Sequence, residues 1–472
     1  MTVGLASRRG RINSDLTVGA DIVSAQRLLS NEGLANVGVQ LSGMGFTLEE
    51  SQARKILSAD QLHNHPVVKR YLNGRDLSQT PRGIYVIDLF GFSHDEARAK
   101  FPELFQHVLA FVKPERDQNP RKSYRENWWI FAEPRKTLRD ALQTLPKFIG
   151  TTRTAKHRLF SFVAGGTIPD AKVVAVALSD SFSLGILSSN VHVAWSTASG
   201  GWLGVGNDPT YNHSECFDKF PFASATAAQR EQIGDLAEQL DAHRKRQQAQ
   251  HPDLTLTGMY NVLEKLKSGE SLTAKENVIH EQGLVSVLKQ LHDELDLAVL
   301  DAYGWSDLAP LIQVVNGNAA AGVKSTPTTR DECKRALDDA MLERLVALNA
   351  ERAAEEKKGA IRWLRPDFQN PDHAAGAKSP PAIQAELNIT EEGDTVVATA
   401  TIQRLPWPKG LPDQVRQVAD VLSSAREPMS LDTIAAHFTG KGPWKRRLPQ
   451  IVETLETLGR ARRVEDGVLG AN

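Results

Sequence analysis

The sequence predicts an α+β protein: a mixed α/β domain, then a helical bundle, then a C-terminal winged helix. Short apolar stretches alternate with glycine- and proline-rich turns through residues 1–222, as in a domain of short strands and helices. From Ala225 onward, leucines recur at spacings of three and four, which is typical of one buried helix face. The pattern over residues 410–472 predicts three helices followed by a hairpin, the order of a winged helix.

Composition indicates an ordinary globular chain. Its 472 residues are 41% hydrophobic and 24% charged, and that length predicts two to four domains. No run of about 18 apolar residues occurs, so we expect no membrane span. The N-terminus lacks the apolar core of a signal peptide, and Cys216 and Cys333 are too few for a disulfide framework or a cysteine zinc site. We expect a cytoplasmic protein with no metal.

Charge is segregated along the chain. The net charge of −1 argues against a uniformly basic protein that coats DNA. Residues 113–158, however, hold 12 lysines and arginines against five acids, and residues 441–463 hold seven against two. Because local fields decide phosphate affinity, both stretches are candidates for DNA contact. Solvated helix faces would give the same pattern, and charge alone leaves both interpretations open.

The first 222 residues are expected to form two parts. Residues 1–80 are a leading segment, with short strands over 33–46 and a helix over 48–57 that Thr47 caps. Residues 81–222 are the mixed α/β domain. Its expected elements are a buried strand over 84–90, helical structure over 94–111, a strand over 172–178, a helix over 190–197 and a loop or hairpin from residue 200.

The remaining residues are expected to be mainly helical. Residues 223–310 form the bundle, and residues 325–370 a long helical extension with Leu337, Met341 and Leu345 on its buried face. In the winged helix at 410–472, Ser430 is the expected N-cap of the second helix.

Aromatic, basic and turn residues are dense between Trp128 and Phe222. The segments include Trp-Trp-Ile-Phe-Ala-Glu-Pro-Arg (128–135), Thr-Ala-Lys-His-Arg-Leu-Phe (154–160) and Cys-Phe-Asp-Lys-Phe-Pro-Phe (216–222). This string resembles the target-recognition domain of a large family of adenine-specific DNA methyltransferases that includes the type IIL restriction–modification enzymes. The similarity extends from about residue 13 to residue 369.

The resemblance implies recognition of double-stranded DNA and methylation at adenine N6 by a core that precedes this region in the family. The sequence contains no match to that core. We therefore expect a DNA-binding specificity subunit of a split methyltransferase in a restriction–modification or phage-defence system. S-adenosylmethionine would bind a separate catalytic subunit, and this chain would hold no cofactor. Other proteins of the defence system are further candidate partners. The alternatives are a stand-alone DNA-binding regulator, a scaffold of a defence complex and a self-sufficient enzyme, which the missing motifs disfavour.

Basic side chains in the recognition domain are the predicted phosphate contacts. They are Arg135, Lys136, Arg139, Arg153, Lys156, His157 and Arg158. His157 could instead be a core histidine. Phosphate contacts fix register and orientation, so these residues would position the protein rather than select a sequence.

The loop after Trp202 is the predicted base-reading element. Its candidate residues are Trp202, Asn207, Asp208, Tyr211 and Asn212, because amides and carboxylates match base edges in the major groove. A surface turn in which Asn207 and Asp208 cap their own backbone is the alternative. Asp208-Pro-Thr-Tyr211 is one residue from the Asp-Pro-Pro-Tyr motif of amino methyltransferases, but the second proline is missing, so we expect no catalytic residue.

A split enzyme also needs an interface with its catalytic subunit. We expect residues 1–60 and the helices of 225–301 to carry it, with four leucines partly exposed in the absence of the partner: Leu236, Leu240, Leu284 and Leu288.

Overall fold

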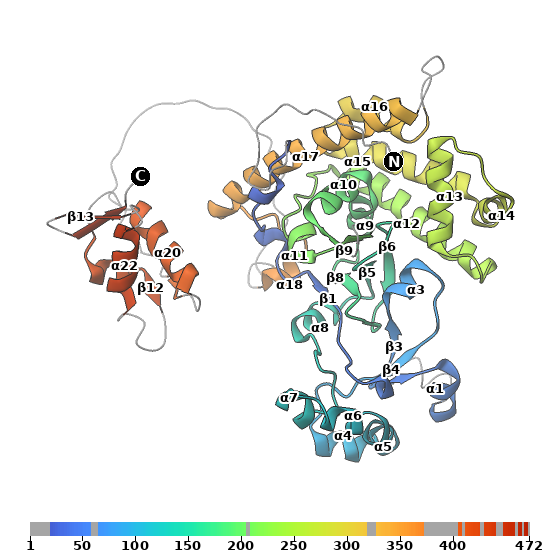
Figure 1. The fold of residues 1–472 in the computed structure, drawn as a ribbon, viewed down its shortest axis with the longest axis horizontal. Helices are drawn as coiled ribbons and strands as arrows, with labels where there is room; N and C mark the ends of the chain where they lie inside the picture. Colours follow the sequence, from blue (N-terminus) through green and yellow to red (C-terminus); the bar gives the residue numbers. More distant parts are fainter. Residues whose placement is uncertain are drawn as a thin grey trace, which may run out of the picture. The chain divides into compact units, whose positions relative to one another are not determined.

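The chain folds into two compact units, residues 1–380 and 381–472 (Figure 1). The computed structural model describes residues 19–57, 65–203, 208–318, 327–371, 405–407, 411–424, 429–439, 447–457, 461–464 and 467–470. Helices predominate, and small sheets lie between them, so the predicted α+β class is confirmed.

A four-stranded antiparallel sheet forms the centre of the first unit. Its order is β1 (Ala35–Val37), β8 (Val173–Val176), β5 (Lys147–Thr152) and β6 (Phe160–Ala164). Every residue of β8 is buried, which confirms the strand predicted from its apolar run. The chain after β1 passes so close to another segment that a Cβ on Gly38 would lie 2.0 Å from the Pro169 carbonyl oxygen. Only glycine fits there.

A second sheet has the order β2 (Thr47–Leu48), β4 (Tyr85–Ile87), β3 (Val68–Leu72) and β7 (Ile168–Pro169). The β3–β7 pair is parallel and the others are antiparallel. The leading segment therefore supplies β1, β2 and β3 to sheets completed by residues after 80. The mixed α/β domain therefore includes residues before 81, because its sheets contain these strands.

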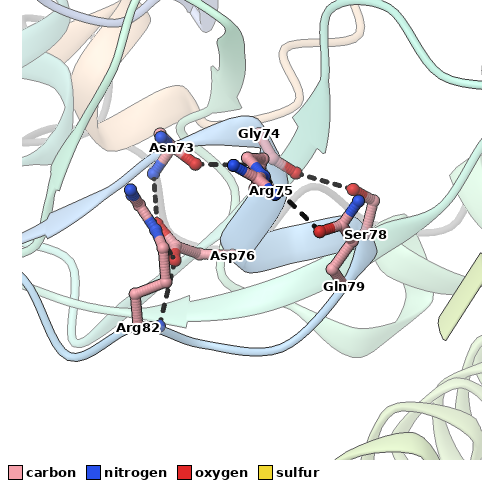
Figure 2. Close-up of polar contacts among 7 residues, drawn as sticks. All are labelled: Asn73, Gly74, Arg75, Asp76, Ser78, Gln79 and Arg82. Atoms are coloured by element: carbon pink, nitrogen blue, oxygen red, sulfur yellow. Dashed lines mark hydrogen bonds and ion pairs between the residues drawn. The ribbon is translucent and has the colours of Figure 1, made fainter. Parts of the chain in front are cut away.

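The turn from β3 to β4 is fixed by one carboxylate. Helix α3 (Gly74–Ser78) begins after Asn73, whose Oδ1 accepts from the Arg75 amide at 2.8 Å. Asp76 accepts from the Asn73 amide at 2.8 Å and from the Arg82 amide and side chain at 2.8–3.1 Å (Figure 2). Because the Asp76 side chain is almost wholly buried, these bonds replace its hydration.

Four short helices pack beside β3 and β4 (Figure 1). They are α4 (His94–Lys100), α5 (Pro102–Phe111), α6 (Lys113–Asp117) and α7 (Lys122–Glu126). The prediction that residues 94–111 are helical is confirmed, but they form two helices, because Pro102 cannot donate to a continuous helical ladder and begins a new helix instead. Arg116, 1% exposed, donates to the carbonyl oxygens of Leu41 and Ile130 at 2.7 and 2.9 Å and so ties this group together.

Helix α1 (Glu50–Ile56) begins two residues later than the sequence predicted. Glu49, not Thr47, is its N-cap, and Gln52 completes the capping box. The Thr47 hydroxyl donates to the Met44 carbonyl at 2.7 Å, so it is occupied before the helix starts.

The helical part is continuous with the recognition domain. It comprises α9 (Ser181–Ser188), α10 (Asn190–Ser199), α12 (Ala227–Gln250), α13 (Leu256–Ser268), α14 (Ala274–Gly283), α15 (Val285–Ala302), α16 (Ala309–Val315) and α17 (Pro327–Lys357). One hydrophobic core joins Trp195 of α10, Leu240 of α12 and Leu295 of α15. Leu337, Met341 and Leu345 of α17 enter the same core, which confirms their predicted buried face. After α17, helix α18 (Pro366–Gln369) returns to the central sheet through Phe368.

The second unit holds three helices and a hairpin in the predicted order. They are α20 (Leu411–Ser424), α21 (Leu431–Ala436), α22 (Leu448–Thr457), β13 (Ala461–Val464) and β14 (Gly467–Gly470). A short parallel pair, β11 (Leu405–Pro406) with β12 (Phe438–Thr439), accompanies them. Ser430 Oγ accepts from the Thr433 amide at 3.1 Å, so Ser430 is the N-cap of α21 as predicted.

Among the helices that the structure describes, none combines the length and the apolar character needed to cross a bilayer.

Candidate nucleic-acid interface

An exposed β-ribbon follows α10. Strands β9 (Gly201–Leu203) and β10 (Asp208–Thr210) pair antiparallel, with Trp202 opposite Pro209 and Leu203 opposite Asp208. All of β9 is exposed, and Trp202 and Leu203 keep 55% and 63% of their surface accessible. The hairpin predicted from residue 200 is therefore present. Asn207 lies outside the residues that the structure describes.

The base of the ribbon is anchored to the central sheet. Thr210 forms an isolated antiparallel bridge with Thr154, and the Tyr211 amide donates to the Arg153 carbonyl at 2.7 Å. At the start of the ribbon, a Cβ on Gly200 would lie 2.5 Å from the Thr210 carbonyl oxygen, so the two chains meet too closely for a side chain. Gly200, Thr210 and Tyr211 thus anchor the ribbon to the domain, and we call them the root of the ribbon.

Tyr211 belongs to that root and not to the reading surface. It is 1% exposed, and its hydroxyl lies 3.0 Å from His192 Nε2. Burial raises the pKa of Tyr211 well above its usual value, so the ring stays neutral. The prediction that Tyr211 reads a base is wrong, because its side chain is enclosed by the domain core.

Two other predicted readers are exposed. Asp208 is the first residue of β10, and it is exposed. Asn212 is the N-cap of α11 (His213–Cys216), and its Oδ1 accepts from the Ser214 amide at 3.3 Å and the Ser214 hydroxyl at 2.9 Å. The Asn212 side chain is therefore engaged in capping α11, although the residue remains exposed.

Arg158 lies in the interior. It is 8% exposed and donates to the Thr151 hydroxyl at 3.2 Å, to the Thr152 carbonyl and to the Pro209 carbonyl at 3.1 Å. Its guanidinium carbon lies 5.1 Å from the centre of the Tyr211 ring. Burial lowers the pKa of Arg158 to about 10, which still leaves it charged at neutral pH. The predicted phosphate contact is corrected, because every direction of this side chain is occupied by protein.

Arg139 is a structural residue as well. It forms a two-pronged ion pair with Asp88, at 2.6 and 3.1 Å. Its guanidinium also packs 4.8 Å from the centre of the Phe90 ring. The pair links α8 (Lys136–Leu142) to the segment after β4, so the predicted phosphate contact of Arg139 is corrected too.

Lys156 and His157 connect the loop before β6 to helix α13. Lys156 Nζ and His157 Nε2 both lie within bonding distance of Asn261 Oδ1, at 2.7 and 2.9 Å. Because an amide oxygen only accepts, His157 donates from Nε2. Burial lowers the pKa of His157, which keeps it neutral. Lys156 remains exposed and His157 is half-buried.

Three arginines from distant parts of the chain act electrostatically on His213, which follows the ribbon, and we call them the arginine triplet. They are Arg27, Arg135 and Arg153. Their positive charges, after burial as the largest cause, lower the pKa of His213. Arg27 and Arg153 are exposed, and Arg135 is half-buried. Lys136, exposed, follows directly as the first residue of α8.

Acidic groups near the triplet only partly offset its charge. Glu133 lies 4.0 Å from the Arg135 guanidinium. Burial raises the pKa of Asp218 to about 6, against the attraction of Arg27. Glu215 is already paired with Lys219 at 2.6 Å.

Arg135 adopts an unusual backbone conformation. Its φ of 56° lies in the left-handed region, which most residues avoid. This conformation lets Arg135 precede α8 while its Nε donates to the Gly38 carbonyl at 3.3 Å. Left-handed non-glycine residues gather at functional sites, because selection must retain them against strain.

Sequence reasoning missed Arg27. Nothing local marks it, since it lies in a short 3₁₀-rich segment far from the basic stretch at 113–158. The hydrogen bond from the Leu28 amide to the Asp218 carbonyl, at 2.8 Å, brings this segment beside α11. Only the tertiary fold reveals the triplet.

The predicted docking leucines are mostly internal. Leu236, Leu240 and Leu288 are 8%, 1% and 0% exposed, because they pack in the shared helical core, so their predicted exposure is wrong. Leu284 is the exception, at 49% exposed and with a φ of 43°.

Comparison with known proteins places this geometry in context. Residues 22–224 match the family model described as the MmeI target recognition domain, which includes the arginine triplet and the ribbon. The chain therefore carries a target recognition domain of this type. The matched residues include the strands β1, β2 and β3 that the leading segment contributes.

The fold is also similar to a solved chain of the type IIL restriction–modification enzyme MmeI in complex with DNA. The TM-score is 0.51 at 16% sequence identity, over 74% of this chain and 40% of that chain. This likeness concerns the fold, and the matched region spans less than half of the solved chain. No curated protein matches the sequence.

Proposed function

We propose that this chain binds duplex DNA and reads its sequence as the specificity subunit of an adenine-N6 methyltransferase in a restriction–modification or phage-defence system. The match of residues 22–224 to a target recognition domain is the observation that carries the proposal. The fold supports it, since the exposed ribbon and the arginine triplet both belong to the matched region.

The proposed division of labour follows burial. The triplet, with Lys136 and Lys156, contacts phosphates, because these cations keep accessible surface. The ribbon reads bases through Trp202, Asp208 and the neighbouring Asn207, and Asn212 lies beside them. A two-stranded ribbon fits the major groove, where a carboxylate can accept from a cytosine amino group.

A salt titration of DNA binding tests this function. Fluorescence anisotropy with a random-sequence duplex would measure the dissociation constant of the full chain between 50 and about 300 mM salt. Removing one phosphate contact, as in Arg153→Ala or Arg27→Ala, should reduce the slope of log K against log salt by roughly 0.9. Arg98→Ala is the matched control, since Arg98 is exposed on α4, away from the triplet. If Arg98→Ala weakened DNA binding as much as Arg153→Ala and Arg27→Ala do, the proposal would be contradicted.

We propose further that a separate chain supplies the catalytic core with its S-adenosylmethionine, and that both act in the cytoplasm. The resemblance of the sequence to methyltransferase recognition domains supports this. Co-expression with neighbouring gene products, followed by affinity purification of this chain, would recover that core. Methylome sequencing of the same cells should then show one adenine motif that disappears when this chain is deleted. A motif that persists would contradict the arrangement.

A stand-alone DNA-binding regulator is the second candidate, and the second unit favours it. We propose that this unit is a winged helix, on the order of α20, α21, α22 and the β13–β14 hairpin. Arg447, before α22, and Arg462, on the hairpin, are exposed cations that would meet phosphates. If Arg462→Ala abolishes DNA binding while Arg153→Ala leaves it intact, the regulator becomes the better reading.

A further inference from the structure

We infer that the β9–β10 ribbon is an apolar wedge that unstacks bases in the bound duplex. This inference rests on the proposed DNA binding and concerns how the ribbon engages the bases. Hydrogen-bond readout needs polar side chains, yet both exposed side chains that β9 presents are large and apolar, Trp202 and Leu203.

The register of the ribbon shows what each face offers. Residues directly opposite in an antiparallel pair share a face, so Trp202 lies with Pro209, and Leu203 lies with Asp208. Successive residues of a strand point to opposite faces, so Trp202 and Leu203 are on different faces. Since both are more than half exposed, neither face of the ribbon is covered by the rest of the domain.

An uncovered ribbon of this composition is costly in water. A tryptophan buries on the order of 200 Å² when it is enclosed, and this is where most proteins place it. In the described part of this chain, Trp195 and Trp128 follow that rule at 0% and 6% exposed. The exposure of Trp202 therefore indicates a binding partner with an apolar surface.

The neighbouring charge identifies that partner as DNA. The Tyr211 amide binds the Arg153 carbonyl, which places the root of the ribbon beside a residue of the arginine triplet. Phosphates held by the triplet would bring the ribbon against the groove. Apolar side chains that insert at a base step unstack it and bend the duplex, and the aromatic ring replaces part of the lost stacking.

The root of the ribbon suits this action. A wedge must resist the restoring force of base stacking, so it needs a rigid support. Tyr211 is locked between His192 and Arg158 inside the core, and the Gly200 backbone lies directly against Thr210. Trp202 and Leu203 are thus attached to a tightly packed, rigid part of the fold.

A mismatch-preference experiment tests the wedge without knowledge of the target sequence. Unstacking a mismatched step costs less free energy than unstacking a paired step. The full chain should therefore bind a duplex with one central mismatch about tenfold more tightly than the fully paired duplex. Trp202→Ala should bring this ratio close to one while leaving the salt slope unchanged. Phe111→Ala, which removes another exposed aromatic on α5, is the control and should keep the ratio. Leu203→Ala should have an intermediate effect.

The outcomes separate the wedge from DNA binding itself. Fluorescence of 2-aminopurine at the mismatch-flanking position should rise on binding of the parent chain and not of Trp202→Ala. A parent chain that binds duplex but shows equal affinity for both duplexes would overturn the wedge and leave the proposed function standing. A mismatch preference that survives in Trp202→Ala would also overturn it. Absence of any duplex binding would remove both proposals together.

Discussion

His192 Nε2 lies 3.0 Å from the hydroxyl of Tyr211, and both side chains are fully enclosed. This pair joins α10, which leads into the ribbon, to the residue that follows β10, which leads out of it. The two ends of the ribbon are therefore held by one buried hydrogen bond. Its strength depends on a neutral imidazole, because a doubly protonated ring would place an uncompensated charge beside Arg158.

The first prediction is a loss of stability in mild acid. Burial, followed by the charge of Arg158, lowers the pKa of His192 to about 3. The unfolded chain has an ordinary histidine pKa near 6.5, so between pH 6.5 and 3 the unfolded state binds the extra proton. Stability is therefore full above pH 6.5 and falls as the pH decreases. At pH 5 the loss from this group is roughly 2 kcal/mol.

Thermal or urea unfolding between pH 7.5 and 5 would measure this effect, with His192→Gln as the comparison. Glutamine can still donate to Tyr211 and does not titrate, so the variant should lose part of the pH dependence. His292 keeps its own contribution, since burial also lowers the pKa of that residue. Identical pH profiles for the parent chain and His192→Gln would show that His192 is not the titrating group.

The second prediction concerns the carboxylate that fixes the β3–β4 turn. Asp76→Asn removes the charge that pairs with Arg82 and turns one acceptor oxygen into a donor that faces one backbone amide and the Arg82 guanidinium. We expect the free energy of unfolding to fall by about 1–3 kcal/mol. Arg75→Ala is the control, because Arg75 is exposed and makes only a 3.4 Å side-chain contact, and it should cost less than about 0.5 kcal/mol. If Asp76→Asn and the parent chain had equal urea midpoints, Asp76 would not be the residue that fixes the β3–β4 turn.

The third prediction uses the left-handed backbone of Arg135. Glycine adopts a φ of 56° without the steric cost that alanine pays, so Arg135→Gly should be more stable than Arg135→Ala by about 1 kcal/mol. At most positions the alanine variant is the more stable of the two, because glycine loses more backbone entropy on folding. Both variants should weaken DNA binding equally, since both lose the guanidinium. Differential scanning calorimetry and anisotropy on the same samples would check the two halves, and a more stable alanine variant would contradict the left-handed assignment.

Local patterns in the sequence were sufficient to predict several elements. The apolar run at 172–178 predicted β8, the spacing of Leu337, Met341 and Leu345 predicted the buried face of α17, and Ser430 predicted the start of α21. Each of these depends on residues within one turn or one strand. The glycine-rich stretch from residue 200 likewise predicted a loop or hairpin. In the structure, the Gly200 backbone lies too close to Thr210 for any larger residue.

The candidate site was harder to predict, because exposure is decided by distant residues. Arg153 and Arg158 lie five positions apart with similar neighbours, yet one is exposed and the other meets Pro209 and Tyr211 from β10 and beyond. The polar loop predicts Tyr211 as a base reader, because no sequence pattern signals that this side chain is buried against His192. Arg27 was missed since only the contact between Leu28 and Asp218 brings it to the triplet.

The last prediction separates these two arginines by experiment. Arg158→Ala removes hydrogen bonds to the Thr152 and Pro209 carbonyls and leaves a cavity under Tyr211, so we expect a loss of about 2–5 kcal/mol in the free energy of unfolding. Arg153→Ala removes an exposed side chain and should change stability by less than about 0.5 kcal/mol. DNA binding should respond in the opposite way. Arg153→Ala should lower the salt slope by roughly 0.9, whereas the folded fraction of Arg158→Ala, measured at low temperature, should keep the slope of the parent chain because Arg158 does not reach a phosphate. A reduced salt slope in folded Arg158→Ala would place that arginine at the DNA and overturn its assignment to the interior.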